Sequence, residues 1–121
     1  MGKRILIVDD ALFMRAMIRK IVEGAQYEVA GEAENGALAV ELYQSLQPDL
    51  VLMDVTMPVM SGLDAARAIK AANPSAAIIM CTALGQANVV QEAMSIGAKG
   101  FIIKPFEPSK VLENIGKVLQ S

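Results

Sequence analysis

Five side chains suited to metal and phosphate chemistry stand at or just beyond the ends of short apolar runs in this sequence. They are Asp9, Asp10, Asp54, Thr82 and Lys104. Each run has about four to six apolar residues without polar alternation, which is typical of a strand buried on both faces of a parallel sheet. Because ligands of such sheets bind outside the carboxyl ends of the strands, we expect these side chains to converge at one edge of one sheet.

The three aspartates indicate a site for a divalent cation. Carboxylates gathered this closely would repel one another and raise each other's pKa values, and a bound cation removes that penalty. Oxygen ligands in a chain without histidine favour a hard ion such as Mg²⁺. An aspartate beside Mg²⁺ can act as a nucleophile toward a phosphoryl group and form an aspartyl phosphate. A simpler interpretation is that Asp10 caps the following helix, while Asp9 and Asp54 are solvated strand ends.

Lys104 and Thr82 supply the groups that phosphoryl transfer needs next. The reaction is catalysed by positioning and by neutralising charge on the phosphoryl oxygens, which an ammonium and a hydroxyl at neighbouring strand ends can do. Taken alone, Lys104 is equally a solvated surface lysine, and Thr82 a helix cap or strand-end hydroxyl.

Composition limits the classes of function. The 121 residues suffice for one domain, and we expect residues 1–121 to form it. A formal net charge of −2 gives no general attraction for nucleic acid. No apolar stretch approaches the roughly 20 residues that span a bilayer, so no membrane segment is expected. The lone cysteine, Cys81, is expected to be an inert core thiol, and the absence of an internal disulfide fits a reducing cytoplasm.

The elements that must position these side chains alternate along the chain. The predicted strands cover residues near 4–9, 28–33, 50–54, 77–81 and 100–103. The predicted helices cover residues from about 14 to a stop at Gly24, 36–46, 63–72, 86–96, and from Pro108 onward. Five βα units with right-handed crossovers predict an α/β fold, with a parallel sheet covered by helices on both faces.

The first predicted helix has a clear apolar stripe. Residues at the spacing of one helix face are expected to be buried together: Met14, Met17, Ile18, Ile21 and Val22.

Four motifs, in this order and spacing, make the chain resemble the receiver domains of two-component response regulators. They are Ile5-Leu6-Ile7-Val8-Asp9-Asp10, Asp54-Val55-Thr56-Met57-Pro58-Val59-Met60-Ser61-Gly62, Thr82-Ala83 and Lys104-Pro105-Phe106. The resemblance covers essentially the whole chain and is closest to single-domain chemotaxis regulators of the CheY type. It implies a doubly wound, flavodoxin-like (βα)5 sandwich of three layers with strand order 2-1-3-4-5.

The resemblance also implies a role for each site residue. Asp54 is the expected phosphoacceptor, and Asp9, Asp10, Asp54 and the backbone carbonyl of Thr56 are the expected Mg²⁺ ligands. Thr82 is expected to contact the phosphoryl oxygens and Lys104 to pair with them. The expected phosphodonor is a phosphohistidine on a sensor histidine kinase. Such a protein is no enzyme beyond catalysing its own phosphorylation and dephosphorylation.

In this family phosphorylation switches a docking face formed by the fourth helix, fifth strand and fifth helix. Thr82 moves toward the phosphate and an aromatic residue of the fifth strand turns inward. That residue is Phe101 here, where chemotaxis regulators more often have tyrosine, so binding to the flagellar motor switch is less expected. We expect Phe101 to be at least partly inward without phosphate, and a cis peptide at Lys104-Pro105. The candidate docking residues are Ala87, Val90, Phe101, Ile103, Phe106 and Lys110.

The expected partners are a sensor kinase, a downstream target protein and a phosphatase, for a cytoplasmic monomer that binds neither nucleic acid nor membrane. With no room for an output domain between Met1 and Ser121, the chain is expected to act by docking, unless it is excised from a larger regulator.

Three other interpretations stay open. A phosphatase of the haloacid dehalogenase type would need an acidic residue where Thr56 stands. Its nucleophile would also lie on the first strand, whereas Asp54 ends the third predicted strand. In a flavodoxin-like cofactor binder, Asp9 and Asp10 would repel the bound phosphate. The third is a receiver-shaped module that is never phosphorylated.

Overall fold

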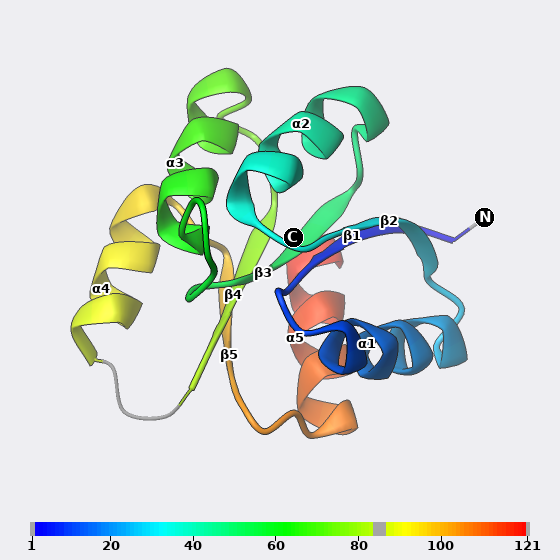
Figure 1. The fold of residues 1–121 in the computed structure, drawn as a ribbon. Coiled ribbons are helices and arrows are strands. Elements are labelled where there is room, and N and C mark those ends of the chain that lie inside the picture. The colour runs from blue at the N-terminus through cyan, green and yellow to red at the C-terminus, as the bar shows by residue number, and fades with distance from the viewer. Residues whose placement is uncertain (1, 84–86, 121) are drawn as a thin grey trace.

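The computed structural model describes residues 2–83 and 87–120, and within them all ten predicted elements are present (Figure 1). The strands are β1 (Arg4–Val8), β2 (Glu28–Ala33), β3 (Leu50–Asp54), β4 (Ile78–Thr82) and β5 (Gly100–Ile103). The helices are α1 (Leu12–Gly24), α2 (Gly36–Leu46), α3 (Gly62–Ala72), α4 (Ala87–Ile96) and α5 (Pro108–Gln120). None of the helices described is long and apolar enough to cross a membrane.

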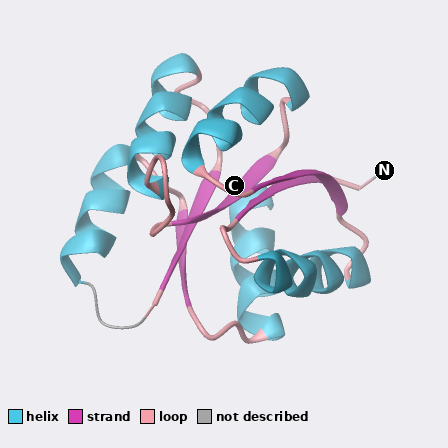
Figure 2. Cartoon of the chain, viewed as in Figure 1, coloured by secondary structure: helices cyan, strands magenta, loops and turns pink. Residues whose placement is uncertain are grey.

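The strands form one parallel sheet in the order β2-β1-β3-β4-β5, which confirms the predicted topology (Figure 2). Helices α2, α3 and α4 cover one face, and α1 and α5 cover the other (Figure 1). Successive strand residues point to opposite faces, so in β1 the side chains of Leu6 and Val8 pack under α2 and α3, whereas Ile5 and Ile7 pack under α1 and α5. This double burial explains why β1, β3 and β4 are apolar without alternation, whereas the edge strand β2 carries glutamates and is only partly buried.

The prediction for the first helix is wrong at one position. Ile18 and Val22 are buried, but the side chain of Met17 is 40% exposed. The helix packs over β1 and β2 and beside α5, so its covered stripe is narrow and Met17 lies at its border. Leu12 and Phe13, in the first turn, are also exposed.

Two turns shape the edge of the sheet at the carboxyl ends of the strands. The loop between β3 and α3 folds back closely, because the amide of Gly62 donates to the carbonyl of Val55 at 2.8 Å. A Cβ on Gly62 would lie 1.9 Å from the carbonyl oxygen of Asp54, so only glycine fits there. After β5, the Lys104-Pro105 peptide is cis, as expected from the family resemblance.

Candidate functional site

Three carboxylates meet at the carboxyl edge of the sheet. Strand β1 pairs with β3 so that Val8 lies beside Met53, which brings Asp9 and Asp10 next to Asp54. One carboxylate oxygen from each of the three aspartates lies within 4.8 Å of the others. Asp9 is 1% exposed and Asp54 5% exposed, whereas Asp10 is exposed at the mouth of the cluster. The structure therefore brings together the three acids that the sequence assigned to metal binding.

Asp10 does not cap α1. The residue at the cap position is Ala11, and it makes no side-chain capping bond. The amide of Ala11 instead donates to Oδ1 of Asp9 at 2.9 Å. The interpretation of Asp10 as a helix cap is therefore wrong.

Lys104 lies against this acidic cluster and is not a solvated surface lysine. Its Nζ is 2.9 Å from Oδ2 of Asp9 and 3.2 Å from Oδ1 of Asp54. The Lys104 amide also donates to the carbonyl of Thr82 at 2.7 Å, which fixes the end of β5 against the end of β4. Burial lowers the pKa of Lys104, but the bond and charge of Asp9 and the charge of Asp54 outweigh it, so the net pKa is raised. Lys104 therefore stays charged.

Thr82 and Thr56 occupy neighbouring places at the same edge. Thr82 is the buried last residue of β4, one position beyond Cys81, which pairs with Asp54 in the sheet. Thr82 ends β4 and the next residue, Ala83, lies outside any helix, so Thr82 is a strand-end residue and not a helix cap. Thr56 follows β3 in the loop, with its side chain exposed. Its carbonyl remains a predicted metal ligand.

The electrostatics of the edge favour a bound cation. Burial and the negative charge of Asp9 raise the pKa of Asp54 to about 6, although Lys104 opposes the shift. A divalent cation would offset both causes, and oxygen donors from three carboxylates fit Mg²⁺. The thiol of Cys81 is buried, and burial raises its pKa to about 12. Cys81 is therefore an unreactive core residue, as predicted.

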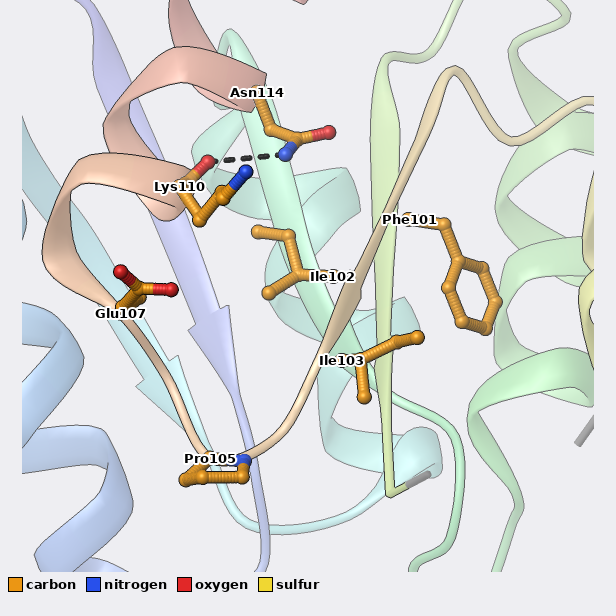
Figure 3. Close-up of a pocket in the computed structure, with 7 residues that line it drawn as sticks. All are labelled: Phe101, Ile102, Ile103, Pro105, Glu107, Lys110 and Asn114. Carbon is orange, nitrogen blue, oxygen red and sulfur yellow. Dashed lines mark hydrogen bonds between the residues drawn. The ribbon is translucent and has the colours of Figure 1, made fainter. Parts of the chain in front are cut away.

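A groove of about 300 Å³ lies between β5 and α5 (Figure 3). It is lined by Phe101, Ile102, Ile103, Pro105, Glu107, Lys110 and Asn114. Three predicted docking residues, Phe101, Ile103 and Lys110, thus border one depression. Figure 3 shows the Phe101 ring directed away from Lys110 and Asn114.

The docking candidates differ in how deeply their side chains are buried and in which core they pack against. Phe101 is half-buried and packs against the core under α2, α3 and α4, and its inward turn without phosphate stays a prediction. Phe106 is half-buried against the opposite core, under α1 and α5, with the Lys104 ammonium 5.9 Å from its ring centroid. Val90 is half-buried on α4, and the side chain of Ala87 lies outside the described residues.

Sequence reasoning missed two groups beside the site. Arg15 on α1 donates to the carbonyl oxygen of Asp9, and Glu32 on β2 accepts from Arg15. No spacing in the sequence links these residues, because their contact depends on how α1 lies over β2. The exposed apolar pair Leu12 and Phe13 was detectable, since both lie off the buried stripe of α1.

The fold and this site define a class of protein. Residues 5–116 match the family model of the response regulator receiver domain, and the chain belongs to this family. The chain is 58% identical to the chemotaxis protein CheY of Thermotoga maritima over 118 residues, which cover 98% of each protein. It is 55% identical to CheY of Bacillus subtilis over 119 residues, covering 98% of this chain and 99% of that protein.

Solved structures agree with the sequence comparisons. One chain of a CheX–CheY complex with BeF3 and Mg²⁺ from Borrelia burgdorferi matches this structure with a TM-score of 0.93 and 33% identity. The match covers 96% of this chain and 88% of that chain. Vibrio cholerae CheY4 matches with a TM-score of 0.91 and 31% identity, covering 98% of this chain and 100% of that chain. The resemblance inferred from the motifs is confirmed, and these relatives support phosphorelay signal transduction with control of chemotaxis.

Proposed function

We propose that residues 1–121 act as a single receiver domain in which Asp54 accepts a phosphoryl group from a phosphohistidine of a sensor histidine kinase. The observation that carries this proposal is the contact of Lys104 with Asp54, beside a cluster of three carboxylates. A lysine that is held charged at this distance is placed to neutralise a phosphoryl group on Asp54. The haloacid dehalogenase alternative lacks support, because the residue two positions after Asp54 is Thr56.

The metal site of the proposal consists of Asp9, Asp10, Asp54 and the backbone carbonyl of Thr56. Mg²⁺ bound there neutralises the carboxylates and the phosphoryl oxygens. The Asp9 carboxylate is held by Lys104 and by the Ala11 amide, whereas Asp10 is accessible from solvent. An ion bound there would be reached from solvent on the side of Asp10.

The chain's own residues divide the work of phosphoryl transfer. An ionised oxygen of Asp54 attacks phosphorus as the phosphorus–nitrogen bond of phosphohistidine breaks, and the imidazole keeps the bonding electron pair. Lys104 pairs with a phosphoryl oxygen, and the Thr82 hydroxyl donates to another. Hydrolysis of the product returns Asp54, so the domain catalyses only its own phosphorylation and dephosphorylation.

The proposed output is a change of the face formed by α4, β5 and α5. Thr82 and Phe101 lie on neighbouring strands, with Phe101 beside Met80 and Thr82 beside Ile103, so a shift of β4 reaches β5 directly. The face offers the groove beside Ile103 and Lys110 to a target protein, which for a chemotaxis regulator includes the flagellar motor switch. Phe101 offers no hydroxyl to that partner.

The proposed partners are proteins only: the kinase, a target and a phosphatase, acting on a cytoplasmic monomer. The exposed apolar side chains of Leu12 and Phe13 follow Asp10 closely and provide contact area for the phosphodonor.

Intact mass spectrometry tests the proposal. After incubation with a small acyl phosphate and Mg²⁺, the protein should gain the mass of one phosphoryl group, and Asp54→Asn should gain none. Glu113→Gln, on the exposed side of α5, is the control and should label like the parent. A receiver-shaped module that is never phosphorylated stays unmodified, and a phosphatase releases phosphate continuously without a lasting adduct.

A further inference from the structure

Arg15 connects the metal-binding turn to the neighbouring strand. Its side chain is only 13% exposed. The Nη1 atom donates to the main-chain oxygen of Asp9 at 2.6 Å, and Nε donates to Oε1 of Glu32 at 3.0 Å. One guanidinium therefore binds both the turn that follows β1 and a carboxylate on β2.

Glu32 is itself fixed. It lies on β2, and Nε of Arg19 donates to its second oxygen at 2.8 Å. Burial raises the pKa of Glu32, but the hydrogen bonds from Arg19 and Arg15 outweigh it, so the net pKa is below the usual value. The carboxylate thus stays ionised, and it neutralises a guanidinium charge that would otherwise repel a cation at Asp9.

The oxygen that Arg15 binds belongs to the peptide between Asp9 and Asp10. The other polar groups of Asp9 are also held: its amide donates to the carbonyl of Ala33 at 3.1 Å, and its Oδ1 accepts from Ala11. The side chain of Asp10, in contrast, is exposed, so the position of its carboxylate depends on the orientation of the main chain that carries it. The bond from Arg15 fixes the orientation of the peptide that carries Asp10.

We propose that Arg15, held by Glu32, is a positioning residue that fixes the Asp9–Asp10 peptide and thereby sets the affinity for Mg²⁺. This inference rests on the proposed Mg²⁺ site and names the residues that hold its shape. Groups outside the ligand set that orient ligands affect metal affinity by about 10- to 100-fold when they are removed.

Calorimetric titration with Mg²⁺ tests the proposal without relying on phosphorylation. Arg15→Met should raise the Kd for Mg²⁺ about tenfold. Arg19→Met is the matched control, because Arg19 lies on the same helix and binds the same Glu32 but does not contact Asp9. Because Arg15 still binds Glu32 and the Asp9 carbonyl in this variant, Arg19→Met should weaken Mg²⁺ binding much less than Arg15→Met does. Arg15→Lys should recover part of the affinity, since a lysine can reach the Asp9 carbonyl but cannot bridge to Glu32 as a planar fork.

Glu32→Gln keeps an acceptor for Arg15 but removes the charge, and it should weaken Mg²⁺ binding less than Arg15→Met does. This milder variant keeps the test decisive if Arg15→Met does not fold. Unchanged Kd values in Arg15→Lys and Glu32→Gln would then overturn the proposal. Equal weakening in Arg15→Met and Arg19→Met would also overturn it, since the loss would then follow from helix stability.

Labelling by an acyl phosphate separates this inference from the proposed function. At saturating Mg²⁺, Arg15→Met should reach the same extent of phosphorylation as the parent. The Mg²⁺ concentration that gives half-maximal phosphorylation should be higher for Arg15→Met. A parent protein that binds Mg²⁺ but takes no phosphoryl group would refute the proposed function and leave the comparison of Kd values valid.

Discussion

The ammonium of Lys104 lies 3.2 Å from a carboxylate oxygen of Asp54, although 50 positions separate them in the chain. Strand β4 stands between β3 and β5 in the sheet, so the lysine reaches over the end of β4 to make this contact. The contact joins the end of β5 to the acidic cluster at the end of β3. It also sets the balance of charge on which the first prediction depends.

Asp54→Asn should stabilise the metal-free protein at neutral pH. The pKa of Asp54 is about 6 in the folded protein, against 3.8 ordinarily, so the folded state prefers the protonated form. The stability that this preference contributes is present below about pH 4 and is lost as the pH rises through 6. At pH 7.5 the ionised carboxylate therefore costs at most about 3 kcal/mol, which the asparagine avoids.

Urea unfolding in EDTA, followed by circular dichroism at several pH values, measures this difference. The excess unfolding free energy of Asp54→Asn over the parent should shrink as the pH is lowered from 6 to 4. An advantage that is constant over this range would show that desolvation of the charge is not its cause.

Asp10→Asn should weaken Mg²⁺ binding several-fold, because it removes one of three clustered negative charges without disturbing the buried Asp9. Glu113→Gln makes the same change of charge at an exposed position of α5 and should bind Mg²⁺ like the parent. Calorimetry decides the matter. Equal Kd values for the parent and Asp10→Asn would remove Asp10 from the metal site.

Gly62→Ala should destabilise the protein by about 1–3 kcal/mol and slow labelling of Asp54. The new Cβ would lie 1.9 Å from the main-chain oxygen of Asp54, so the loop or the strand end must move. Gly116→Ala is the control, because a Cβ there meets nothing within 4 Å and the residue lies inside α5. The free energy of unfolding of that variant should rise by up to about 1 kcal/mol. A neutral Gly62→Ala would mean that the loop adapts freely.

Val59→Gly should stabilise the protein by about 1 kcal/mol. Val59 forms the centre of a γ-turn, with the Met60 amide donating to the Pro58 carbonyl at 2.7 Å and a φ of 70°. This conformation is unfavourable for a β-branched residue, and the side chain is 83% exposed, so glycine loses little packing. Val59→Ile keeps the branched Cβ and should leave the free energy of unfolding unchanged. A loss of stability in Val59→Gly would show that the valine makes contacts that offset its strain.

The fold was predictable because its central strands β1, β3 and β4 are buried on both faces. Continuous apolar runs such as those ending at Asp54 and Lys104 leave few other assignments, and the polar residue after each run marks the functional edge. Periodicity alone did not give the width of a buried stripe, so Met17 was assigned to the core although α1 leaves it exposed. A repeating pattern tells which side of a helix is apolar and not how far its neighbours extend over it.

Contacts between polar side chains on different elements were beyond the sequence. The bond from Arg15 to Glu32 depends on how α1 is rotated over β2, which no residue pattern encodes. The phosphoryl-binding role of Thr82 was inferred from its place at a strand end, whereas the switching roles of Thr82 and Phe101 came from the family resemblance and stay predictions.

Thr82→Ala should uncouple the docking face from Asp54 while leaving Asp54 reactive. Phosphorylation adds nearly two negative charges at Asp54, and an element with two arrangements must carry the effect to β5. Thr82 stands between the two, because its carbonyl accepts from the Lys104 amide and its neighbour in the sheet is Ile103. Beryllofluoride with Mg²⁺, used as a phosphate mimic, should shift the methyl signals of Ile103 and Val90 in the parent. The shifts should be much smaller in Thr82→Ala, although labelling by an acyl phosphate still occurs at Asp54. Equal shifts in both proteins would show that the Thr82 hydroxyl is not needed for the coupling, which would then run through Lys104 and the end of β5.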